Sequence, residues 1–337
     1  KKLFTENNVV DKIVIFEARN EIDEAHFIAM KSKDLIASGV KAENIAVLYR
    51  ANFQSRVLEE AFLSYGVPYQ MLGTKFFERK EIKDLISFIR VSLNPESLGD
   101  FNRIINIPPR GIGKVTLEKI ITGKESELPE SAKIKINNFR NQLNDFRNVL
   151  LTQKPSEALK YIIKTSGIEN MYSTGLEDDT DRLENIMELV TLATSYDTVE
   201  GEEGIEKFLT DTSLASDQDA LDGEKSGVKL MTVHSSKGLE FEYVFISGLE
   251  ADLFPHQKMG GGKKSGEDSE EERRLFYVAV TRAGKKLFLT HAQTRTIFGS
   301  TEINSPSEFI DDIPEKYLEN ESYSGETKRK PLFSIDF

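Results

Sequence analysis

Short apolar segments rich in β-branched residues alternate with segments of helical periodicity at the start of this chain. Residues 12–18 and 44–49 are typical of buried strands, because short apolar runs bounded by turn residues fit the interior of a sheet. Each is followed by apolar residues at helical spacing, over 21–38 and 55–65, and then by a glycine that can end the helix. This alternation predicts βαβ units and a parallel sheet, and it restricts the fold to the α/β class.

The middle of the chain has a different pattern. From residue 81 to residue 222 the periodicity is mostly helical and no strong strand signal occurs; Phe139, Leu143 and Phe146 are an example of the helical spacing. We also expect a helix that starts after Pro155, with Ser156 as its N-cap. This stretch therefore predicts a mainly helical domain.

Apolar strand signals return near the end of the chain. They lie at residues 228–233, 243–247 and 286–290, with a helix expected at about 271–283. The simplest architecture is one α/β domain into which the helical domain is inserted. We therefore predict an α/β domain at 1–72 and 226–315, a helical insertion at 73–225 and a C-terminal tail at 316–337.

The charge of the chain is unevenly distributed. Its net charge of −12 argues on its face against a nucleic-acid partner, because the phosphates of that partner are negative as well. Acidic residues predominate over 177–224, however, whereas basic residues outnumber acidic ones over 103–147. An acidic chain of this kind can still present a basic strip to a phosphate backbone.

The composition also limits covalent chemistry and cellular location. There are no cysteines, which excludes disulfides, thiolate metal sites and a cysteine nucleophile. No run of about 18 apolar residues occurs, so a membrane-spanning helix is not expected. The first residues lack the apolar core of a signal peptide. We expect a cytoplasmic protein without a membrane partner.

The loop at residues 232–241 has the composition of an anion-binding loop. It follows an expected strand, and open α/β sheets bind ligands at strand ends. Hydroxyl groups, backbone N–H groups and a lysine can all bind an anion, although the loop taken alone can equally be a surface turn with a solvated lysine. The residues that carry this hypothesis are Thr232, His234, Ser235, Ser236, Lys237 and Gly238.

The segment at residues 270–283 is expected to be a packed helix that ends beside a strand. Arg282 lies at its C-terminal end, where a cation interacts favourably with the helix dipole. A guanidinium in this position can alternatively bind a phosphate. Arg273 and Arg274 stand next to acidic residues and can form surface ion pairs, which contribute little stability.

Together these segments resemble a known family. "TVHSSKGLEF" (232–241) resembles motif V, and "EERRLFYVAVTRA" (271–283) resembles motif VI, of superfamily 1 DNA helicases of the UvrD/PcrA/Rep kind. "AVLYRANFQSRVLEEAFLSYGVPYQMLGTKFFERKEIKDL" (46–85) and "NIPPRGIGKVTLEKI" (106–120) resemble further segments of that family in the same order. The resemblance covers about residues 1–315.

The resemblance implies a RecA-like 2A domain interrupted by a helical 2B domain, with ATP bound between 2A and a preceding 1A domain. It implies that Arg282 is the arginine finger, the catalytic contact to the γ-phosphate, and that Glu240 binds the ribose hydroxyl groups. Lys237 and Gly238 then lie on the nucleotide side of their loop. ATP and Mg²⁺ are the implied cofactors, held mainly by the 1A domain.

The resemblance also implies contacts with DNA. Phe298 matches the aromatic pin at the point of strand separation, where its ring can stack on bases. The single-strand track then includes Arg50, Asn52, Thr232, His234 and Ser235.

A third DNA contact is implied in the 2B domain. Glycines let a backbone approach a phosphate closely, and the helix that follows presents free N–H groups, although an isolated Gly-x-Gly is usually an ordinary turn. Contacts of this kind would be independent of base sequence. The residues are Arg110, Gly111, Gly113, Lys114 and Thr116.

The sequence contains no G-x-x-x-x-G-K-[ST] phosphate-binding loop. Taken with this absence, the resemblance implies the C-terminal motor half of an ATP-dependent 3′–5′ DNA helicase or translocase, which we expect not to hydrolyse ATP alone. The expected partners are single-stranded DNA, junctions of single- and double-stranded DNA, the 1A and 1B domains, and repair or replication proteins. The alternatives are a non-motor regulatory or interaction module, a helicase–nuclease relative and a plain nucleotide-binding enzyme.

Overall fold

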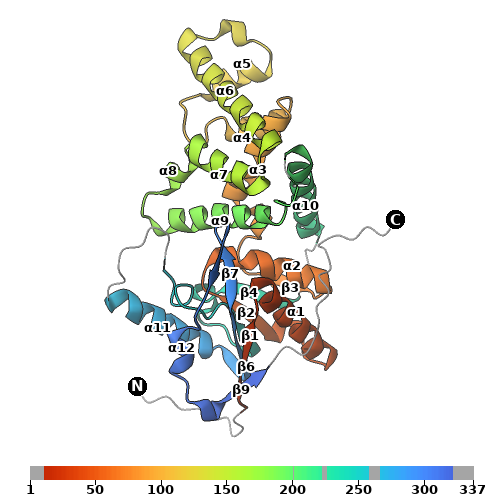
Figure 1. Ribbon diagram of the computed structural model, residues 1–337, viewed down its shortest axis with the longest axis vertical. Coiled ribbons are helices and arrows are strands. Elements are labelled where there is room, and N and C mark those ends of the chain that lie inside the picture. The colour runs from red at the N-terminus through yellow and green to blue at the C-terminus, as the bar shows by residue number, and fades with distance from the viewer. Residues whose placement is uncertain (1–10, 200, 222–225, 258–265, 322–337) are drawn as a thin grey trace. The chain divides into compact units, whose positions relative to one another are not determined.

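The computed structural model describes residues 11–199, 201–221, 226–257 and 266–321. The chain forms two compact units (Figure 1). The first, called the sheet unit, contains residues 1–75, 223–296 and 301–337, and the second, called the helical unit, contains residues 76–222 and 297–300. The helical unit is thus inserted within the sequence of the sheet unit.

The sheet unit is built on a seven-stranded sheet with the order β3-β4-β2-β5-β6-β1-β9. Neighbouring strands in this order pair in parallel, as the alternation of strands and helices predicts. The α/β fold class, with a helical insertion between β3 and β4, is thereby confirmed. The strands are β1 (Ile13–Ala18), β2 (Ile45–Tyr49), β3 (Tyr69–Met71), β4 (Val228–Thr232), β5 (Phe241–Ile246), β6 (Ala283–Ala292) and β9 (Leu318–Glu321).

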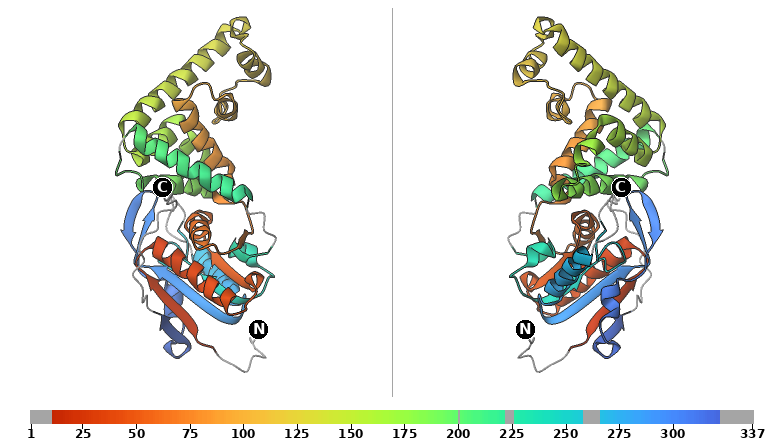
Figure 2. Two further views of the ribbon diagram at one scale, coloured as in Figure 1. Left: turned by 90° about the vertical axis from the view of Figure 1, so that its right-hand side faces the viewer. Right: turned by 90° about the vertical axis from the view of Figure 1, so that its left-hand side faces the viewer.

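Helices cover both faces of this sheet (Figure 2). On one face α1 (Glu21–Ala37) and α2 (Ser55–Tyr65) enclose a core that includes Phe16 and Phe288. On the other face α11 (Gly266–Val280) and α12 (Glu308–Asp311) enclose a second core, which includes Phe254 and Phe309. Because both faces are covered, every residue of β2 is buried, and the strand is a continuous apolar run rather than an alternating one.

The ends of α1 and α2 follow from their flanking residues. The side chain of Asn20 accepts a hydrogen bond from the backbone N–H of Asp23 at 2.9 Å and so caps the start of α1. Helix α2 ends at Gly66, whose φ of 60° is left-handed and favours glycine. The predicted glycine stop after this helix is therefore confirmed.

Several short strands are not predicted by the sequence pattern. They are β3, β9 and the two strands of a hairpin, β7 (Thr294–Ile297) and β8 (Ser300–Ile303). Strand β9 lies within the segment predicted to be a tail, and its polar sequence carries little strand propensity. It becomes a strand because it pairs with the edge of β1, from Ile13↔Leu318 to Phe16↔Glu321. Residues 322–337 of the predicted tail lie outside the described residues.

The helical unit packs around aromatic side chains. Phe88 lies edge-to-face with Phe139, at 6.3 Å between ring centroids, and with Phe146, at 6.1 Å. The helical spacing of Phe139, Leu143 and Phe146 is confirmed, since all three are buried on one helix. The helices are α3 (Lys80–Leu93), α4 (Leu98–Ile104), α5 (Lys114–Ile121), α6 (Glu130–Thr152), α7 (Pro155–Ser166), α8 (Ile168–Tyr172), α9 (Glu177–Thr194) and α10 (Glu202–Leu221).

Helix α7 begins two residues earlier than predicted. Pro155 occupies its first turn and Lys154 is the N-cap residue, so the prediction of Ser156 as N-cap is wrong. A proline suits this position because a backbone N–H there would have no partner within the helix. The Ser156 hydroxyl instead donates a hydrogen bond to Asp197 at 2.5 Å.

Short 3₁₀ turns connect several of these elements. They are η1 (Ala42–Asn44), η2 (Asn52–Gln54), η3 (Phe76–Glu78), η4 (Glu125–Glu127), η5 (His234–Ser236) and η6 (Glu315–Tyr317).

Within the described ranges, no helix combines the length and the apolarity needed to cross a membrane.

Candidate functional site

Several of the expected site residues in the sheet unit lie at the carboxyl edge of the sheet, where its parallel strands end. Thr232 is the last residue of β4 and is paired with Tyr49, the last residue of β2. Arg50 follows Tyr49 directly and therefore belongs to the same edge as Thr232. This edge brings together two sequence segments that the resemblance assigns to the single-strand track.

Other site residues lie at the opposite, amino edge. Phe241 begins β5 and is paired with Ala283, the first residue of β6. Glu240 and Arg282 directly precede these two residues and so lie beside each other at this edge. The loop at 233–240 therefore runs from the carboxyl edge to the amino edge, and only its start lies at the carboxyl end of a strand.

The start of this loop, which lies at the carboxyl edge of the sheet, is held by hydroxyl groups. The Thr232 hydroxyl oxygen accepts a hydrogen bond from the backbone N–H of Ser235 at 3.3 Å and lies 3.0 Å from the Ser235 hydroxyl. The Ser236 hydroxyl is buried and donates to the carbonyl oxygen of Val233 at 2.7 Å. His234 and Ser235 remain exposed on the resulting 3₁₀ turn η5. The loop is thus a fixed polar surface rather than a loose one.

Arg282 joins the end of α11 to the loop at the amino edge. Its Nη1 donates to the carbonyl oxygen of Leu239 at 2.7 Å, its Nε to that of Val278 at 3.0 Å, and its Nη2 to the Thr281 hydroxyl at 3.0 Å. The bond to Val278 satisfies a carbonyl group in the last turn of the helix, which is the helix-end role left open by the sequence. Its partners are neutral oxygens, and the guanidinium remains partly exposed to solvent.

Glu240 lies between Leu239 and Phe241, and both of these neighbours are hydrogen-bonded to Arg282. The backbone N–H of Phe241 donates to the carbonyl oxygen of Arg282 at 2.9 Å, while Arg282 bonds to Leu239 on the other side. Glu240, Lys237 and Gly238 are all exposed. At the amino edge, an exposed glutamate therefore neighbours a partly exposed arginine, with an exposed lysine in the same loop.

Arg50 is held in an ion pair at the carboxyl edge. Its Nη2 lies 2.5 Å from Oε1 of Glu272, and its Nε donates to both carboxylate oxygens of Glu272 at 2.9 and 3.0 Å. The side chains are only 11% and 9% exposed. Burial opposes ionisation of Glu272, but the hydrogen bonds and charge of Arg50 hold the pKa of Glu272 below its usual range.

The guanidinium of Arg50, which the resemblance assigns to the single-strand track, is thus committed to a carboxylate. Glu272 also accepts a hydrogen bond from the backbone N–H of His256 at 2.9 Å. Helix α11 therefore has Glu272 at the carboxyl edge and leads to Arg282 at the amino edge. Like the loop at 233–240, it connects the two edges of the sheet.

The turn after β2 fixes the backbone around Arg50. The side-chain oxygen of Gln54 accepts hydrogen bonds from the backbone N–H groups of Arg50 and Ala51, at 3.0 and 2.8 Å. Asn52, the remaining expected residue of the single-strand track, begins the turn η2 and is half-buried. Gln54 and Glu272 thus both position Arg50, one through its backbone and one through its side chain, although the sequence alone assigns a role to neither residue.

In the helical unit Arg110 is turned inward. Its Nη1 donates to backbone carbonyl oxygens, at 2.8 Å for Ile107, and its Nη2 donates to the side chain of Gln142 at 3.2 Å. The guanidinium lies over the ring of Phe139 at 4.4 Å. Burial lowers the pKa of Arg110 to about 10. Arg110 therefore shapes its loop, because its guanidinium is bonded to oxygens of the protein and packed on an aromatic ring.

The neighbouring glycines and α5 form an exposed surface. Gly111 has a left-handed φ of 67°, and Gly113 is the N-cap residue of α5, so no capping side chain covers the N–H groups of its first turn. Lys114 is exposed beside them and Thr116 is half-buried. Lys135 of α6 also approaches this loop, with its Nζ 3.4 Å from the carbonyl oxygen of Gly111. Sequence reasoning counts Lys135 only as part of a basic region.

Phe298 lies in the turn between β7 and β8. It is a non-glycine residue with a positive φ, 55°, and Gly299 beside it has a φ of 77°. The backbone N–H of Gly299 donates to the Thr191 hydroxyl at 3.1 Å. Phe298 is half-buried. The left-handed backbone at both residues gives the hairpin a tight turn that carries an aromatic side chain.

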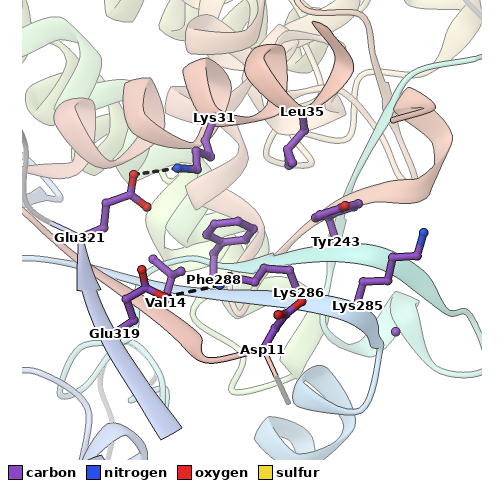
Figure 3. A pocket seen from close by; sticks show the side chains of 11 residues that line it. Asp11, Val14, Lys31, Leu35, Tyr243, Lys285, Lys286, Phe288, Glu319 and Glu321 are labelled. Atoms are coloured by element: carbon purple, nitrogen blue, oxygen red, sulfur yellow. Dashed lines mark hydrogen bonds and ion pairs between the residues drawn. The ribbon is translucent and has the colours of Figure 1, made fainter. Parts of the chain in front are cut away.

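A cavity of about 510 Å³ lies in the sheet unit between α1 and the amino ends of the strands (Figure 3). Two ion pairs join its walls, Lys31 with Glu321 at 2.7 Å and Lys286 with Glu319 at 3.6 Å. Both glutamates belong to β9, so these pairs join the edge strand to α1 and to β6. The lining contains no residue that the sequence analysis assigns to a site.

The described residues satisfy only part of what ATP and Mg²⁺ require. Arg282 can contact a phosphate and Glu240 a ribose, but the sequence offers no loop that cradles a triphosphate. Across the described ranges, no group of three histidine, aspartate or glutamate side chains is arranged to hold a metal ion. The residues present therefore fit one side of a nucleotide site.

Comparisons with known proteins agree with the resemblance. The sequence matches the family described as UvrD-like helicase C-terminal domain, over residues 1–129 and 125–294. It is 39% identical over 354 residues to the ATP-dependent DNA helicase PcrA of Staphylococcus epidermidis, covering 99% of this chain and 48% of that protein. It is 40% identical over 347 residues to PcrA of Staphylococcus aureus, covering 96% and 46%. The chain spans about half the length of the curated relatives it matches.

Proposed function

The chain belongs to the UvrD-like helicase C-terminal domain family, and we propose on that basis that it is the C-terminal motor half of an ATP-dependent 3′–5′ DNA helicase or translocase. In this proposal it provides one wall of the ATP site. A second half, with a phosphate-binding loop, provides the other wall and most ligands of the nucleotide and Mg²⁺. This division is supported by the PcrA relatives, because the chain aligns with only about half the length of each.

The observation that carries the proposal is the connection of Arg282 to the loop that bears Glu240. Arg282 would act as the arginine finger, since the neutral oxygens that it now bonds can be exchanged for a phosphate, which forms stronger, charge-assisted hydrogen bonds. Glu240 would accept hydrogen bonds from the ribose hydroxyl groups. Lys237 and Gly238 precede Glu240 in the same exposed loop and would face the nucleotide.

The topology suggests how nucleotide binding acts on DNA. Both the loop at 233–240 and helix α11 connect the amino edge of the sheet to its carboxyl edge. A pull on Arg282 at the amino edge is therefore transmitted along α11 toward Glu272 and its partner Arg50. We propose that the same movement reaches Thr232 through the loop. These covalent and ion-paired connections would link ATP turnover to grip on the single strand.

The proposed DNA track uses the carboxyl edge. Asn52, Thr232, His234 and Ser235 would contact the sugar–phosphate backbone, with Arg50 held in place by Glu272. Contacts of this kind fix the register without reading the base sequence. Phe298 would stack on a base at the junction of single- and double-stranded DNA.

In the helical unit, the free N–H groups at the start of α5 would bind a duplex phosphate. Lys114, Thr116 and the backbone of Gly111 and Gly113 form that surface, and we add Lys135 to it. The proposed setting is the cytoplasm of a cell in which repair or replication proteins are partners.

A complementation experiment tests the proposal. We define the joined motor as this chain expressed together with the phosphate-loop half that we propose accompanies it. DNA-stimulated ATP hydrolysis should be absent from this chain alone and present in the joined motor, with unwinding of a 3′-tailed duplex. Hydrolysis by this chain alone would contradict the division of the site. A joined motor without DNA-stimulated hydrolysis would instead favour a non-motor interaction module.

A further inference from the structure

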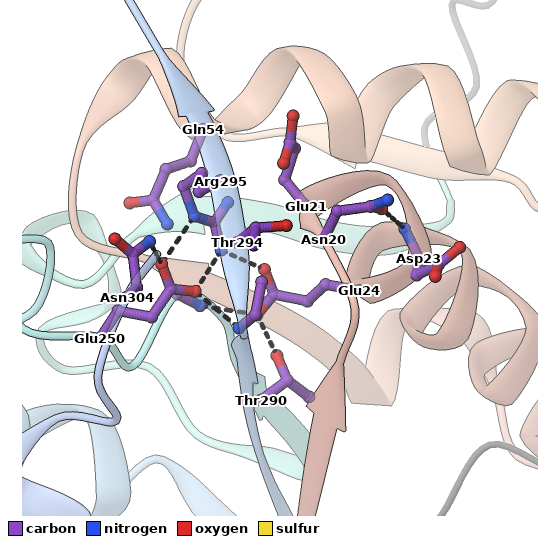
Figure 4. A network of polar contacts seen from close by, with 12 residues as sticks. Asn20, Glu21, Asp23, Glu24, Gln54, Glu250, Thr290, Thr294, Arg295 and Asn304 are labelled. Carbon is purple, nitrogen blue, oxygen red and sulfur yellow. Dashed lines mark hydrogen bonds and ion pairs between the residues drawn. The ribbon is translucent and has the colours of Figure 1, made fainter. Parts of the chain in front are cut away.

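A buried cluster of charges lies at the root of the hairpin formed by β7 and β8 (Figure 4). Arg295 of β7 lies between Glu24 of α1 and Glu250, which follows β5. Its Nη2 is 2.5 Å from Glu24 and 2.6 Å from Glu250, and its Nε donates to Glu250 at 2.8 Å. The three residues are 4%, 3% and 0% exposed, so water does not share in these bonds.

Further donors complete the hydrogen bonding of both carboxylates. Glu24 accepts from the Thr290 hydroxyl at 2.6 Å and from the backbone N–H of Gly248 at 2.8 Å. Glu250 accepts from the backbone N–H of Ala292 at 2.7 Å. Burial alone would disfavour the ionised form, but the charge and hydrogen bonds of Arg295 hold the pKa of Glu250 below its usual range.

Buried ion pairs of this kind contribute little net stability compared with apolar side chains, because taking charges out of water is costly. Such pairs do constrain orientation, because hydrogen bonds from one guanidinium to two carboxylates permit few relative arrangements of the three side chains. The cluster joins three elements of the sheet unit: α1, the segment after β5, and β7. A role in orientation therefore accounts for the cluster better than a role in stability.

Glu250 contacts both ends of the hairpin. Arg295 lies at its beginning, and Asn304, directly after β8, donates from Nδ2 to Oε2 of Glu250 at 2.7 Å. The backbone N–H of Asn304 also donates to the carbonyl oxygen of Gln293 at 2.9 Å. One buried carboxylate thus holds the strand that enters the hairpin and the strand that leaves it. Phe298 lies in the turn between these strands, three residues after Arg295.

We propose that Glu250, acting through Arg295 and Asn304, is a positioning residue that fixes the direction of the hairpin so that Phe298 meets the first base pair of duplex DNA. This inference rests on the proposed function, in which Phe298 stacks at the strand-separation point. None of the three positioning residues contacts DNA in this account. Their effect on unwinding passes entirely through Phe298.

Asn304→Ala is the test variant, because Asn304 is only half-buried and the change leaves the Arg295 ion pairs in place. Glu302→Gln is the matched control, since Glu302 is an exposed residue of β8, two positions before Asn304. Phe298→Ala removes the ring itself. Amide hydrogen exchange of this chain gives the first readout. Asn304→Ala should speed exchange within β7 and β8 and leave β1 to β6 unchanged, whereas Glu302→Gln should change neither.

The second readout uses the joined motor. Asn304→Ala should slow unwinding of a 3′-tailed duplex by roughly threefold or more, as expected for a lost hydrogen bond to a charged group, with single-strand-stimulated ATP hydrolysis unchanged. In the Phe298→Ala background the same substitution should have no further effect, because the two residues act in series.

Three results would overturn the inference. Asn304→Ala could leave hydrogen exchange and unwinding unchanged, it could lower unwinding and hydrolysis in parallel, or it could add its full effect to that of Phe298→Ala. Each would mean that Glu250 and its partners do not act through Phe298. A Phe298→Ala variant that unwinds normally is a different result. It would remove the proposed role of Phe298 itself, and the inference would fall with it.

Discussion

The guanidinium of Arg282 donates a hydrogen bond to the carbonyl oxygen of Leu239 at 2.7 Å, across 43 positions of sequence. The backbone bond from Phe241 to Arg282, at 2.9 Å, lies on the other side of Glu240. The backbone at the exposed residue Glu240 is therefore held beside Arg282 by two hydrogen bonds, one on each side of Glu240. This arrangement is what makes the amino edge of the sheet the candidate for one wall of a nucleotide site.

The ion pair between Arg50 and Glu272 should be important for stability. Glu272→Gln removes the negative charge and leaves a largely buried guanidinium without its counter-ion, so the free energy of unfolding should fall by roughly 3 kcal/mol. Urea unfolding of this chain measures the change. Glu271→Gln is the control. The adjacent Glu271 is exposed, and its ion pair with Arg274 is long, at 3.7 Å, so its loss should have little effect. Equal losses for both variants would contradict the account of the pair.

Gly248 should be intolerant of a side chain for two separate reasons. Its φ is 73°, and a Cβ there would lie 2.3 Å from the side-chain nitrogen of Gln54 and 2.9 Å from Leu253. Gly248→Ala should therefore lower the free energy of unfolding by more than about 2 kcal/mol. Gly39→Ala separates the two causes, because Gly39 has a φ of 99° but no neighbour within 4 Å. We expect it to cost about 1 kcal/mol, from backbone conformation alone. A smaller loss at Gly248 than at Gly39 would refute the steric argument.

The stability of this chain should depend on pH through His26. Burial lowers the pKa of His26, an effect that the charges of Asp23 and Glu60 only partly offset. Because the folded state binds the proton less readily than the unfolded state, the contribution of His26 is fully present above the unfolded pKa of about 6.5. It decreases as the pH falls from there through the folded pKa.

Measurement of the free energy of unfolding at pH 8 and pH 5.5 tests this dependence. The wild-type chain should lose stability on acidification, and His26→Gln should lose less over the same interval. A His26→Gln variant with the same pH dependence as the wild type would show that other groups account for it.

The loop at Gly111 and the start of α5 should bind duplex DNA through charge. Lys114→Ala and Lys135→Ala should each weaken duplex binding uniformly across sequences and reduce the salt slope by about 1. Lys133→Ala on the same helix as Lys135 is the control, because Lys133 pairs with Glu130 at 2.9 Å. An unchanged salt slope for both test variants would remove this surface from the DNA interface.

Arg110 should behave differently from these lysines. Arg110→Ala removes donors from buried carbonyl groups and a cation from the Phe139 ring, so it should lower the thermal stability of the helical unit. Thermal unfolding of this chain, followed by circular dichroism, compares Arg110→Ala with Lys114→Ala. Weakened DNA binding with unchanged stability would restore Arg110 to the role that the sequence predicts.

Much of the sheet could be predicted from the sequence, because buried parallel strands are apolar on both faces and glycines end the helices between them. β2 is an example, with every residue buried. β9 and the hairpin strands could not, since they are short and polar and form only because a partner strand lies beside them. Local propensity carries no signal for such contacts.

The candidate site was predictable in its residue types but not in its contacts. Sequence motifs identify Arg282 and Arg50, yet not that Arg50 is paired with Glu272 from 222 positions away. The motifs also do not show which site residues lie at the carboxyl edge of the sheet and which lie at the amino edge, because that depends on which strands are neighbours. Glu250 has no sequence signal at all, since a buried acid without its partners looks like a surface residue.

The steady-state turnover of the joined motor tests the central claim most directly. Arg282→Ala should lower kcat for single-strand-stimulated ATP hydrolysis by roughly 10³-fold or more, as expected for loss of an arginine finger. The Kd for single-stranded DNA should stay within about threefold, because Arg282 lies at the edge of the sheet away from the proposed strand track. A kcat close to that of the wild type, or equal losses in kcat and DNA affinity, would contradict the assignment of Arg282 to the nucleotide.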